Sequence, residues 1–125
     1  MKKILIIDDD RMIVTILQFR LEKEKFNIIV CEDGKKAKKL MEVEKPDLVI
    51  ADIMMPMVSG LEIINFIRNK KKWDIPIVVL SSINDDKTLL EAYTLGADEF
   101  VTKPFSPEEL VIRIKKMLLS TRSNA

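Results

Sequence analysis

Five short aliphatic runs recur along the chain, and each is separated from the next by a stretch long enough for a helix. The runs are Ile4 to Ile7, Phe26 to Val30, Leu48 to Ala51, Ile77 to Leu80 and Phe100-Val101. The intervening stretches carry apolar residues at helical spacing, as in Ile13, Leu17 and Leu21. Strands that alternate with helices form right-handed βαβ units. The sequence therefore predicts an α/β domain with a doubly wound, five-stranded parallel sheet.

Polar residues stand at the predicted helix boundaries. Side chains able to accept hydrogen bonds from the first free amides of a helix are Asp33, Ser59, Asn84 or Asp85, and Ser106. Ser59 and Ser106 are each followed three residues later by a glutamate, which is typical of a capping box. Gly96 is the predicted C-cap of the fourth helix.

The length of 125 residues fits one domain, which we expect at residues 1–120, with 121–125 as a frayed tail or the start of a linker. The 21 basic and 20 acidic residues nearly cancel, which argues against a nucleic-acid-binding module. Cys31 has no partner for a disulfide and is predicted to be a small buried apolar residue. The aliphatic run after Met1 is too short for a signal peptide or a membrane span. We therefore expect a soluble, cytoplasmic protein.

Two lysine clusters have structural explanations. Lys35, Lys36, Lys38 and Lys39 surround apolar residues of the second predicted helix. Because no aromatic residues interleave with them, a solvated helix face is favoured over a nucleic-acid patch. The run Lys70 to Lys72 closes the third predicted helix, where cations suit the helix dipole. Trp73, which follows, is expected to cover the sheet edge rather than to bind a ligand.

Chemically useful side chains follow the ends of four predicted strands. They are Asp8 and Asp9 after the first, Asp52 at the third, Ser81 at the fourth and Lys103 after the fifth. The carboxyl ends of parallel strands meet at one edge of a sheet, where open α/β sheets hold ligands. Acids crowded at that edge repel one another unless they take up a proton or bind a cation. Each residue alone also fits a simpler role, such as a helix cap at Asp9 or Asp10 or a turn at Asp52.

The residue types at this edge favour a site that handles phosphate with Mg²⁺. Carboxylate oxygens are the ligands that Mg²⁺ prefers, and Lys103 and Ser81 are of the types that contact phosphoryl oxygens. The chain has no histidine and no glycine-rich phosphate loop, which disfavours Ser-His-Asp hydrolysis and nucleotide binding. The remaining candidate nucleophile is a carboxylate, which can accept a phosphoryl group as an acyl phosphate.

Four motifs occur in a specific order and spacing. They are the first run with Asp8-Asp9-Asp10, then Asp52-Ile53-Met54-Met55-Pro56 with Gly60 eight residues after the aspartate, then Ser81, and finally Gly96 to Phe105. In this order they resemble the receiver domain of bacterial two-component response regulators over essentially the whole chain. The resemblance implies a single domain with the flavodoxin-like (βα)5 fold.

The resemblance implies that Asp52 is the phosphoacceptor, which takes a phosphoryl group from a histidine of a sensor kinase in a Mg²⁺-dependent reaction. Asp9 resembles the direct metal ligand, Asp8 acts mainly through metal-bound water, and Asp52 and the backbone carbonyl of Met54 complete the metal site. Such a domain has weak self-catalysed chemistry and is not a conventional enzyme.

The resemblance also implies a switch. Ser81 stands at the position of the hydroxyl that bonds the phosphoryl group, and Lys103 at that of the conserved lysine, whose peptide bond to Pro104 is cis in the family. Phe100 resembles the aromatic that turns inward on phosphorylation. The surface of the fourth helix, fifth strand and fifth helix would then change.

Several residues depart from the family pattern. Ser82 follows the switch hydroxyl where Ala or Gly is usual, and Ser59 replaces a common Asp. Met54 and Ile83 line the mouth of the pocket in the family, and here both are apolar. Neither can orient an attacking water through a polar side chain.

The charged face used for dimerisation in receivers of winged-helix transcription factors is only partly present. Its matching residues are Asp98, Glu99, Glu109 and Arg113. Leu89 and Ser120 stand where that subfamily has basic residues. A phosphorylation-dependent homodimer is therefore an expectation that rests on a partial match.

Two other functions remain open. The first is an unphosphorylated pseudo-receiver that acts as a docking module, and phosphodonor labelling would distinguish it. The second is an aspartyl-phosphate phosphohydrolase, although such enzymes place a second acid two residues after the nucleophile, where this chain has Met54. Turnover of phosphate monoesters would distinguish that enzyme.

Overall fold

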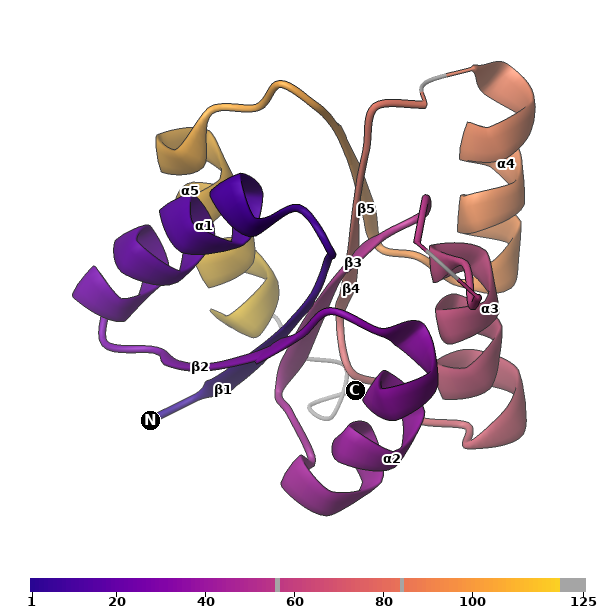
Figure 1. Cartoon of the computed structure of the whole chain (residues 1–125), viewed down its shortest axis with the longest axis horizontal. Coiled ribbons are helices and arrows are strands. Elements are labelled where there is room, and N and C mark those ends of the chain that lie inside the picture. Colours follow the sequence, from indigo (N-terminus) through magenta and orange to yellow (C-terminus); the bar gives the residue numbers. More distant parts are fainter. Residues whose placement is uncertain (56, 84, 120–125) are drawn as a thin grey trace.

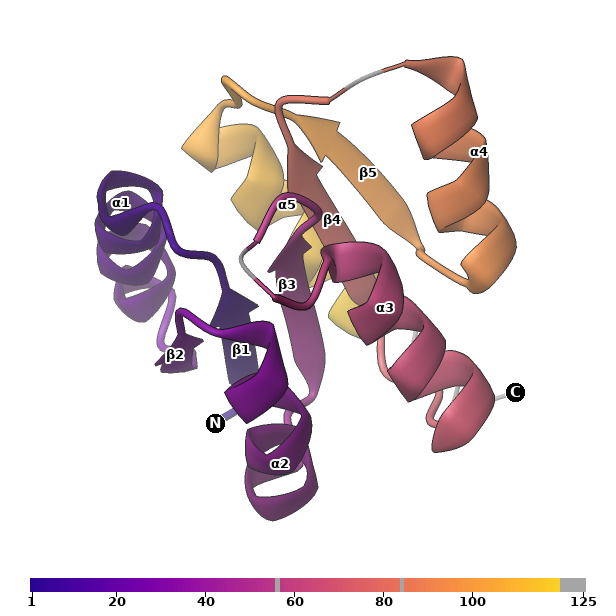
Figure 2. The same ribbon diagram turned by 45° about the vertical axis from the view of Figure 1, so that its right-hand side comes forward.

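Five parallel strands form one twisted sheet in the order β2-β1-β3-β4-β5 (Figures 1 and 2). The structure is a computed structural model that describes residues 1–55, 57–83 and 85–119. The strands are β1 (Lys3–Ile7), β2 (Asn27–Cys31), β3 (Leu48–Asp52), β4 (Ile77–Ser81) and β5 (Glu99–Thr102). Four of them contain the predicted aliphatic runs in full, and β2 begins one residue after the start of its run at Phe26, so the predicted α/β fold class is confirmed.

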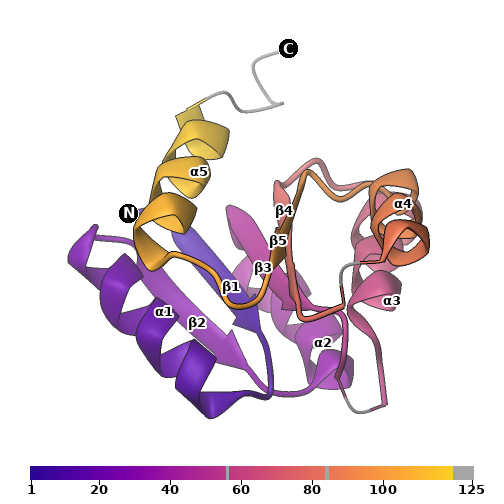
Figure 3. The ribbon, with the colours of Figure 1, turned by 90° about the horizontal axis from the view of Figure 1, so that it is seen from above.

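Helices cover both faces of the sheet. They are α1 (Arg11–Lys23), α2 (Gly34–Glu44), α3 (Gly60–Asn65), the π-helical turn η1 (Phe66–Lys70), α4 (Asp86–Leu95) and α5 (Pro107–Leu119). Figure 3 shows α1 and α5 on one side and α2, α3 and α4 on the other. The alternation of side chains along β1 serves both layers, because Ile4 and Ile6 pack with α1 and α5, whereas Leu5 and Ile7 pack with the opposite helices.

The predicted caps begin and end the helices as expected. The side chains of Asp33, Ser59 and Asp85 accept hydrogen bonds from backbone amides in the first turns of α2, α3 and α4. Ser106 Oγ accepts from the amide of Glu109 at 3.3 Å, and Gly96 ends α4 with φ at 121°. Asn84, the alternative cap of α4, lies outside the described residues, as do Pro56, Ser120 and the predicted tail at 121–125.

The third helix changes character at Phe66, where the α-helix continues as η1. Arg68 in this turn donates to the carbonyl oxygens of Gly96 and Trp73 and to the carboxylate of Asp98, at 2.8–3.0 Å. Asp98 also accepts from the amide of Ile77 at 2.8 Å. These bonds tie the end of the third helix to the start of β4 and to the turn before β5. The sequence analysis did not anticipate this network.

The expectations for Cys31 and for the lysines of α2 agree with the structure. Cys31 is buried, and its Sγ donates to the carbonyl oxygen of Asp33 at 3.1 Å. Ala37 and Met41 of α2 are buried, whereas the lysines around them are exposed or half-buried. Among the described residues, no helix is both long enough and apolar enough to cross a bilayer.

Candidate functional site

The register of the sheet brings the predicted site residues to one edge. Ile7 of β1 pairs with Ala51 of β3, so Asp8 leaves β1 beside Asp52. Asp52 in turn pairs with Leu80, which precedes Ser81 on β4. Lys103 follows β5, and its backbone amide donates to the carbonyl oxygen of Ser81 at 2.9 Å. The convergence expected from the sequence is therefore present.

Three carboxylates form a compact acidic cluster. Oxygen atoms of Asp8, Asp9 and Asp52 all lie within 4.8 Å of one another. Asp8 and Asp52 are 1% and 5% exposed, whereas Asp9 is exposed at the surface. Because two acids are buried and the third faces solvent, an ion can reach the cluster from outside. This donor set fits a hard divalent cation.

Lys103 is the cation of the site. Its Nζ lies 3.1 Å from Asp8 Oδ2 and 3.4 Å from Asp52 Oδ2, so one ammonium contacts both buried acids. The Lys103-Pro104 peptide bond is cis, as the family resemblance implies. A single positive charge against three carboxylates leaves a net charge near −2, which a divalent cation would neutralise.

Burial raises the pKa of the Asp52 carboxyl, and the charge of Asp8 raises it further. Lys103 and the amide of Met54 act in the opposite direction but do not cancel the rise. Burial also disfavours the charged form of Lys103, yet the neighbouring Asp8 and Asp52 outweigh it and raise the pKa of the ammonium. Lys103 therefore stays protonated at neutral pH.

Short local hydrogen bonds orient the acids and the hydroxyl. Asp8 Oδ1 accepts from the amide of Asp10 at 2.9 Å, and Asp52 Oδ1 accepts from the amide of Met54 at 3.2 Å. Ser81 Oγ accepts from the amide of Ile83 at 3.0 Å, so its hydroxyl hydrogen can serve another acceptor. Asp10, rather than Asp9, caps α1. The cap explanation left open for Asp9 is thus wrong in this structure.

The mouth of the site is apolar where the family resemblance placed Met54 and Ile83. Met54 is 60% exposed and Ile83 is half-buried, while Ser82 is exposed. Phe100 lies in the core with 9% exposure, next to Val79 across the β4–β5 pair. Its amide donates to the hydroxyl oxygen of Tyr93 on α4 at 3.2 Å, which links the predicted switch aromatic to that helix.

The charged residues of the expected dimer face are paired within the chain. Arg113 contacts Glu99 and Glu109, each at 2.7 Å. Asp98 is bound by Arg68 at 2.8 Å, with only 16% of its side chain exposed. Arg68 is a residue that the sequence analysis missed, and its place in the middle of the third helix gave no signal for it.

The chain is similar to known proteins in both sequence and structure. The family model described as the response regulator receiver domain matches residues 4–115. The chain is 41% identical over 117 residues to the alkaline phosphatase synthesis transcriptional regulatory protein PhoP of Bacillus subtilis (strain 168). That alignment covers 94% of this chain and 48% of PhoP, so the chain spans about half the length of this curated relative.

Two solved structures are similar over nearly their whole length. A two-component response regulator from Clostridium difficile has 30% identity and a TM-score of 0.90, with all of both chains covered. The BeF3-activated N-terminal receiver domain of RstA from Klebsiella pneumoniae has 31% identity and a TM-score of 0.87, with 94% of this chain and 98% of that chain covered.

Proposed function

The chain belongs to the response regulator receiver domain family of two-component systems, and on that premise we propose that Asp52 accepts a phosphoryl group from a histidine of a sensor kinase. Receiver domains are phosphoacceptor switches rather than conventional enzymes. The observation that carries the proposal is the position of Asp52, which ends the central strand β3 within reach of two further carboxylates and one ammonium. This arrangement supports phosphoryl transfer better than simple docking.

In the proposed reaction, a carboxylate oxygen of Asp52 attacks the phosphorus of a phosphohistidine. The new O–P bond forms while the P–N bond breaks, and the electron pair returns to the imidazole nitrogen, which takes up a proton. Asp52 Oδ1 already accepts a hydrogen bond from Met54, which leaves Oδ2, the oxygen nearer Lys103, as the attacking atom. The raised pKa of the carboxyl makes the oxygen more basic and so a better nucleophile.

Mg²⁺ is the proposed cofactor. Asp8, Asp9, Asp52 and the backbone carbonyl of Met54 would hold it, and the net negative charge of the acidic cluster supports this assignment. Its contribution would be to neutralise charge on the transferring phosphoryl group. Without a cation, the incoming phosphoryl group would meet three carboxylates and only one ammonium.

Lys103 and Ser81 are the proposed contacts for the phosphoryl oxygens. Lys103 remains charged because its two acidic neighbours raise its pKa, so it supplies a fixed positive charge. Ser81 is fully buried, and its hydroxyl hydrogen can be donated because Oγ is oriented as an acceptor for Ile83. Both groups would bind the phosphorylated form more strongly than the resting form.

We propose that this difference stabilises one packing of the α4-β5-α5 surface. Phe100 of β5 is buried in the core that β5 shares with α4, and its amide donates to the hydroxyl oxygen of Tyr93 on that helix. Movement of Ser81 toward a phosphoryl group would favour this inward position of Phe100. Since binding energy can only shift an existing equilibrium, the switch is a population shift between two packings.

The partners also belong to the proposal. A sensor histidine kinase or a phosphotransfer protein would supply the phosphoryl group. PhoP is by its name a transcriptional regulator and is twice as long as this chain, which supports a DNA-binding effector as the downstream partner. A homodimer through α4-β5-α5 would have to accommodate the intrachain pairs of Arg113 and Asp98.

Phosphodonor labelling tests the proposal. Incubation with radiolabelled acetyl phosphate or a phosphorylated sensor kinase and Mg²⁺ should label the wild type and leave Asp52→Ala unlabelled. Asp74→Ala changes an exposed aspartate far from the acidic cluster and should label like the wild type. Equal labelling of Asp52→Ala would remove Asp52 as the acceptor. A folded wild type that no donor labels would favour the docking module.

The metal assignment has its own test. Asp9→Ala should lose labelling at every Mg²⁺ concentration, because Asp9 is the proposed direct ligand of the metal that the reaction needs. Labelling of that variant at the wild-type rate in EDTA would remove Asp9 and the metal from the reaction.

A further inference from the structure

A cavity lies at the sheet edge opposite the acidic cluster, among the segments that lead into β3 and β4. Its volume is about 520 Å³, which is within the usual range for small-molecule sites. Most of its walls are apolar and come from α2, the loop before β3, the loop after η1 and the last turn of α5. These wall residues are Met41, Pro46, Trp73, Ile75, Pro76 and Leu118.

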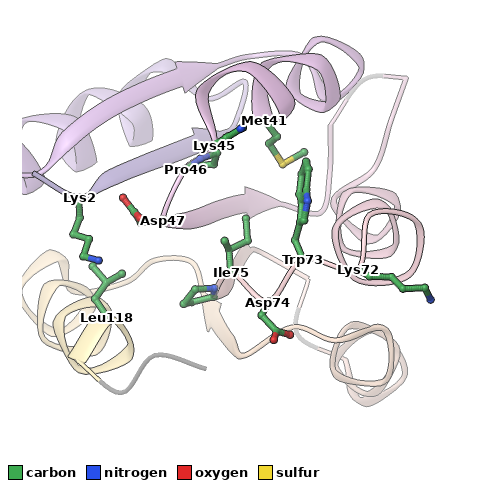
Figure 4. Close-up of a pocket in the computed structure, with 11 residues that line it drawn as sticks. Lys2, Met41, Lys45, Pro46, Asp47, Lys72, Trp73, Asp74, Ile75 and Leu118 are labelled. Carbon is green, nitrogen blue, oxygen red and sulfur yellow. The ribbon is translucent and has the colours of Figure 1, made fainter. Parts of the chain in front are cut away.

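The two ends of the cavity are held by different parts of the chain (Figure 4). Trp73 stands at one end beside Met41, and Leu118 and Lys2 stand at the other. Trp73 is half-buried, so part of its indole ring faces the cavity. A flat apolar molecule that reached from Trp73 to Leu118 would cover both side chains.

The position of Trp73 is fixed before any ligand binds. Its amide donates to the carbonyl oxygen of Ile67 at 2.9 Å, and its own carbonyl oxygen accepts from Arg68 at 2.9 Å. The ring packs edge-on against Phe66 with centroids 6.1 Å apart. A pre-organised aromatic wall lowers the entropy cost of binding.

The rim of the cavity favours an anionic group. The rim carries three lysines and two aspartates, namely Lys2, Lys45, Lys72, Asp47 and Asp74. Asp47 is already engaged, because its Oδ2 accepts from the amide of Lys3 at 2.7 Å. Within the described residues, the ammonium groups of Lys2 and Lys45 form no ion pair. An anion bound beside these lysines would gain attraction without breaking a salt bridge.

We propose that this cavity binds a small amphipathic anion with a flat aromatic body, which lies against Trp73 and directs its acidic group toward Lys2 at the other end, while Lys45 adds positive charge to the rim. The charged rim is unlike the broad apolar surface that a partner helix would need. The proposal does not rest on phosphorylation at Asp52.

Energy transfer from Trp73 provides a direct test, because this is the single tryptophan of the chain. The probe is 8-anilinonaphthalene-1-sulfonate, and its neutral counterpart is N-phenyl-1-naphthylamine, which has the same aromatic body without the sulfonate. We expect saturable transfer from Trp73 to the anionic probe and affinity for it about tenfold higher than for the neutral one. Equal affinity for the two probes, or no transfer from Trp73, would overturn the proposal.

Matched charge variants locate the anion. Lys2→Gln/Lys45→Gln should weaken binding of the anionic probe by about fivefold or more, whereas affinity for the neutral probe should not change. Lys36→Gln/Lys39→Gln removes the same charge from α2 outside this cavity and should keep the wild-type affinity. An equal loss in both variants would show that only net charge attracts the probe. Cooperative melting of each variant establishes that it is folded.

Discussion

Gly60 packs directly against the backbone carbonyl of Asp52, so closely that a Cβ atom added to the glycine would lie 2.8 Å from that carbonyl carbon. The amide of Gly60 also donates to the carbonyl oxygen of Ile53 at 3.0 Å. These contacts fix the start of α3 on the end of β3. The glycine therefore determines how closely the segment after Asp52 can fold back beside the acidic cluster.

Replacement of Gly60 by alanine should destabilise the fold. In a helix, alanine is ordinarily favoured over glycine by about 1 kcal/mol. Here the added methyl group meets backbone atoms of Asp52, and such overpacking costs about 1–3 kcal/mol. We expect a net loss of up to about 2 kcal/mol in the free energy of unfolding, measured by urea denaturation. Thr94→Ala, on the exposed face of α4, should be neutral or stabilising, and a stabilised Gly60→Ala would show that the backbone moves freely.

Asp52→Asn should raise the melting temperature in metal-free buffer. Burial and the charge of Asp8 raise the pKa of the Asp52 carboxyl, so the ionised form is destabilising in the folded state at neutral pH. Asparagine keeps the shape without the charge, and Lys103 keeps its contact with Asp8 at 3.1 Å. Thermal unfolding in EDTA measures the effect, and Glu91→Gln, which removes an exposed carboxylate from α4, should melt like the wild type.

The same carboxyl predicts a pH dependence. Because its folded pKa is raised, the unfolded chain loses this proton first, and stability falls as pH rises from the unfolded value of about 3.9 through the folded pKa. The difference in melting temperature between Asp52→Asn and the wild type should therefore grow with pH across that interval and then stay constant. A difference that shrinks with rising pH would mean that the pKa of Asp52 is lowered instead.

Asp8 is expected to behave differently from Asp52, although both belong to the acidic cluster. Its carboxylate accepts from the amide of Asp10 and lies closer to Lys103 than Asp52 does. Asp8→Asn should therefore stabilise the metal-free protein less than Asp52→Asn. Millimolar Mg²⁺ should raise the melting temperature of the wild type more than that of either variant, because binding to the folded state alone stabilises it.

Arg68→Met should cost about 3 kcal/mol or more of stability. The arginine side chain is 13% exposed and donates to Gly96, Trp73 and Asp98, and the loss of one partner of a buried ion pair is strongly destabilising. Arg113→Met is the matched control, because Arg113 also contacts two acids but is 39% exposed, and exposed pairs contribute about 0–1 kcal/mol. Equal losses in the two variants would contradict the structural importance assigned to Arg68.

Much of the fold could be predicted from the sequence because the signals were local. Aliphatic runs located all five strands, and capping residues such as Asp33 and Ser59 located helix starts within a residue. The convergence of Asp8, Asp52 and Lys103 followed from strand polarity, since parallel strands bring their ends to the same edge.

The features that could not be predicted depend on contacts between distant segments. The π-helical turn at Phe66 has no sequence signature, and the bonds of Arg68 join it to residues about 30 positions away. The sequence also showed no aromatic among the lysines of α2, yet the Nζ atom of Lys38 lies 5.5 Å from the centroid of the Phe66 ring. Such pairs become visible only after the helices have packed.

The apolar mouth of the site predicts a long-lived phosphorylated form. Hydrolysis of an acyl phosphate on Asp52 needs a water in line with the phosphorus, and a polar side chain at the mouth can hold it. Met54 is 60% exposed there and Ile83 is half-buried, and neither offers a hydrogen bond to water. We expect phospho-Asp52 to outlive that of receivers with Asn or Glu at these positions, which suits a slow response such as transcription.

Met54→Asn/Ile83→Glu should therefore lose its phosphoryl group faster than the wild type. One hydrogen bond to the attacking water is worth about 1–2 kcal/mol, or roughly tenfold in rate. Decay of the radiolabel at fixed Mg²⁺ measures the lifetime. Val43→Asn/Ile112→Glu makes the same changes at exposed apolar positions on α2 and α5 and should decay like the wild type. If the phosphoryl group of the mouth variant decays no faster than that of this control, water placement at Met54 and Ile83 does not set the lifetime. Ser82, which is exposed and follows Ser81, is then the next residue to vary.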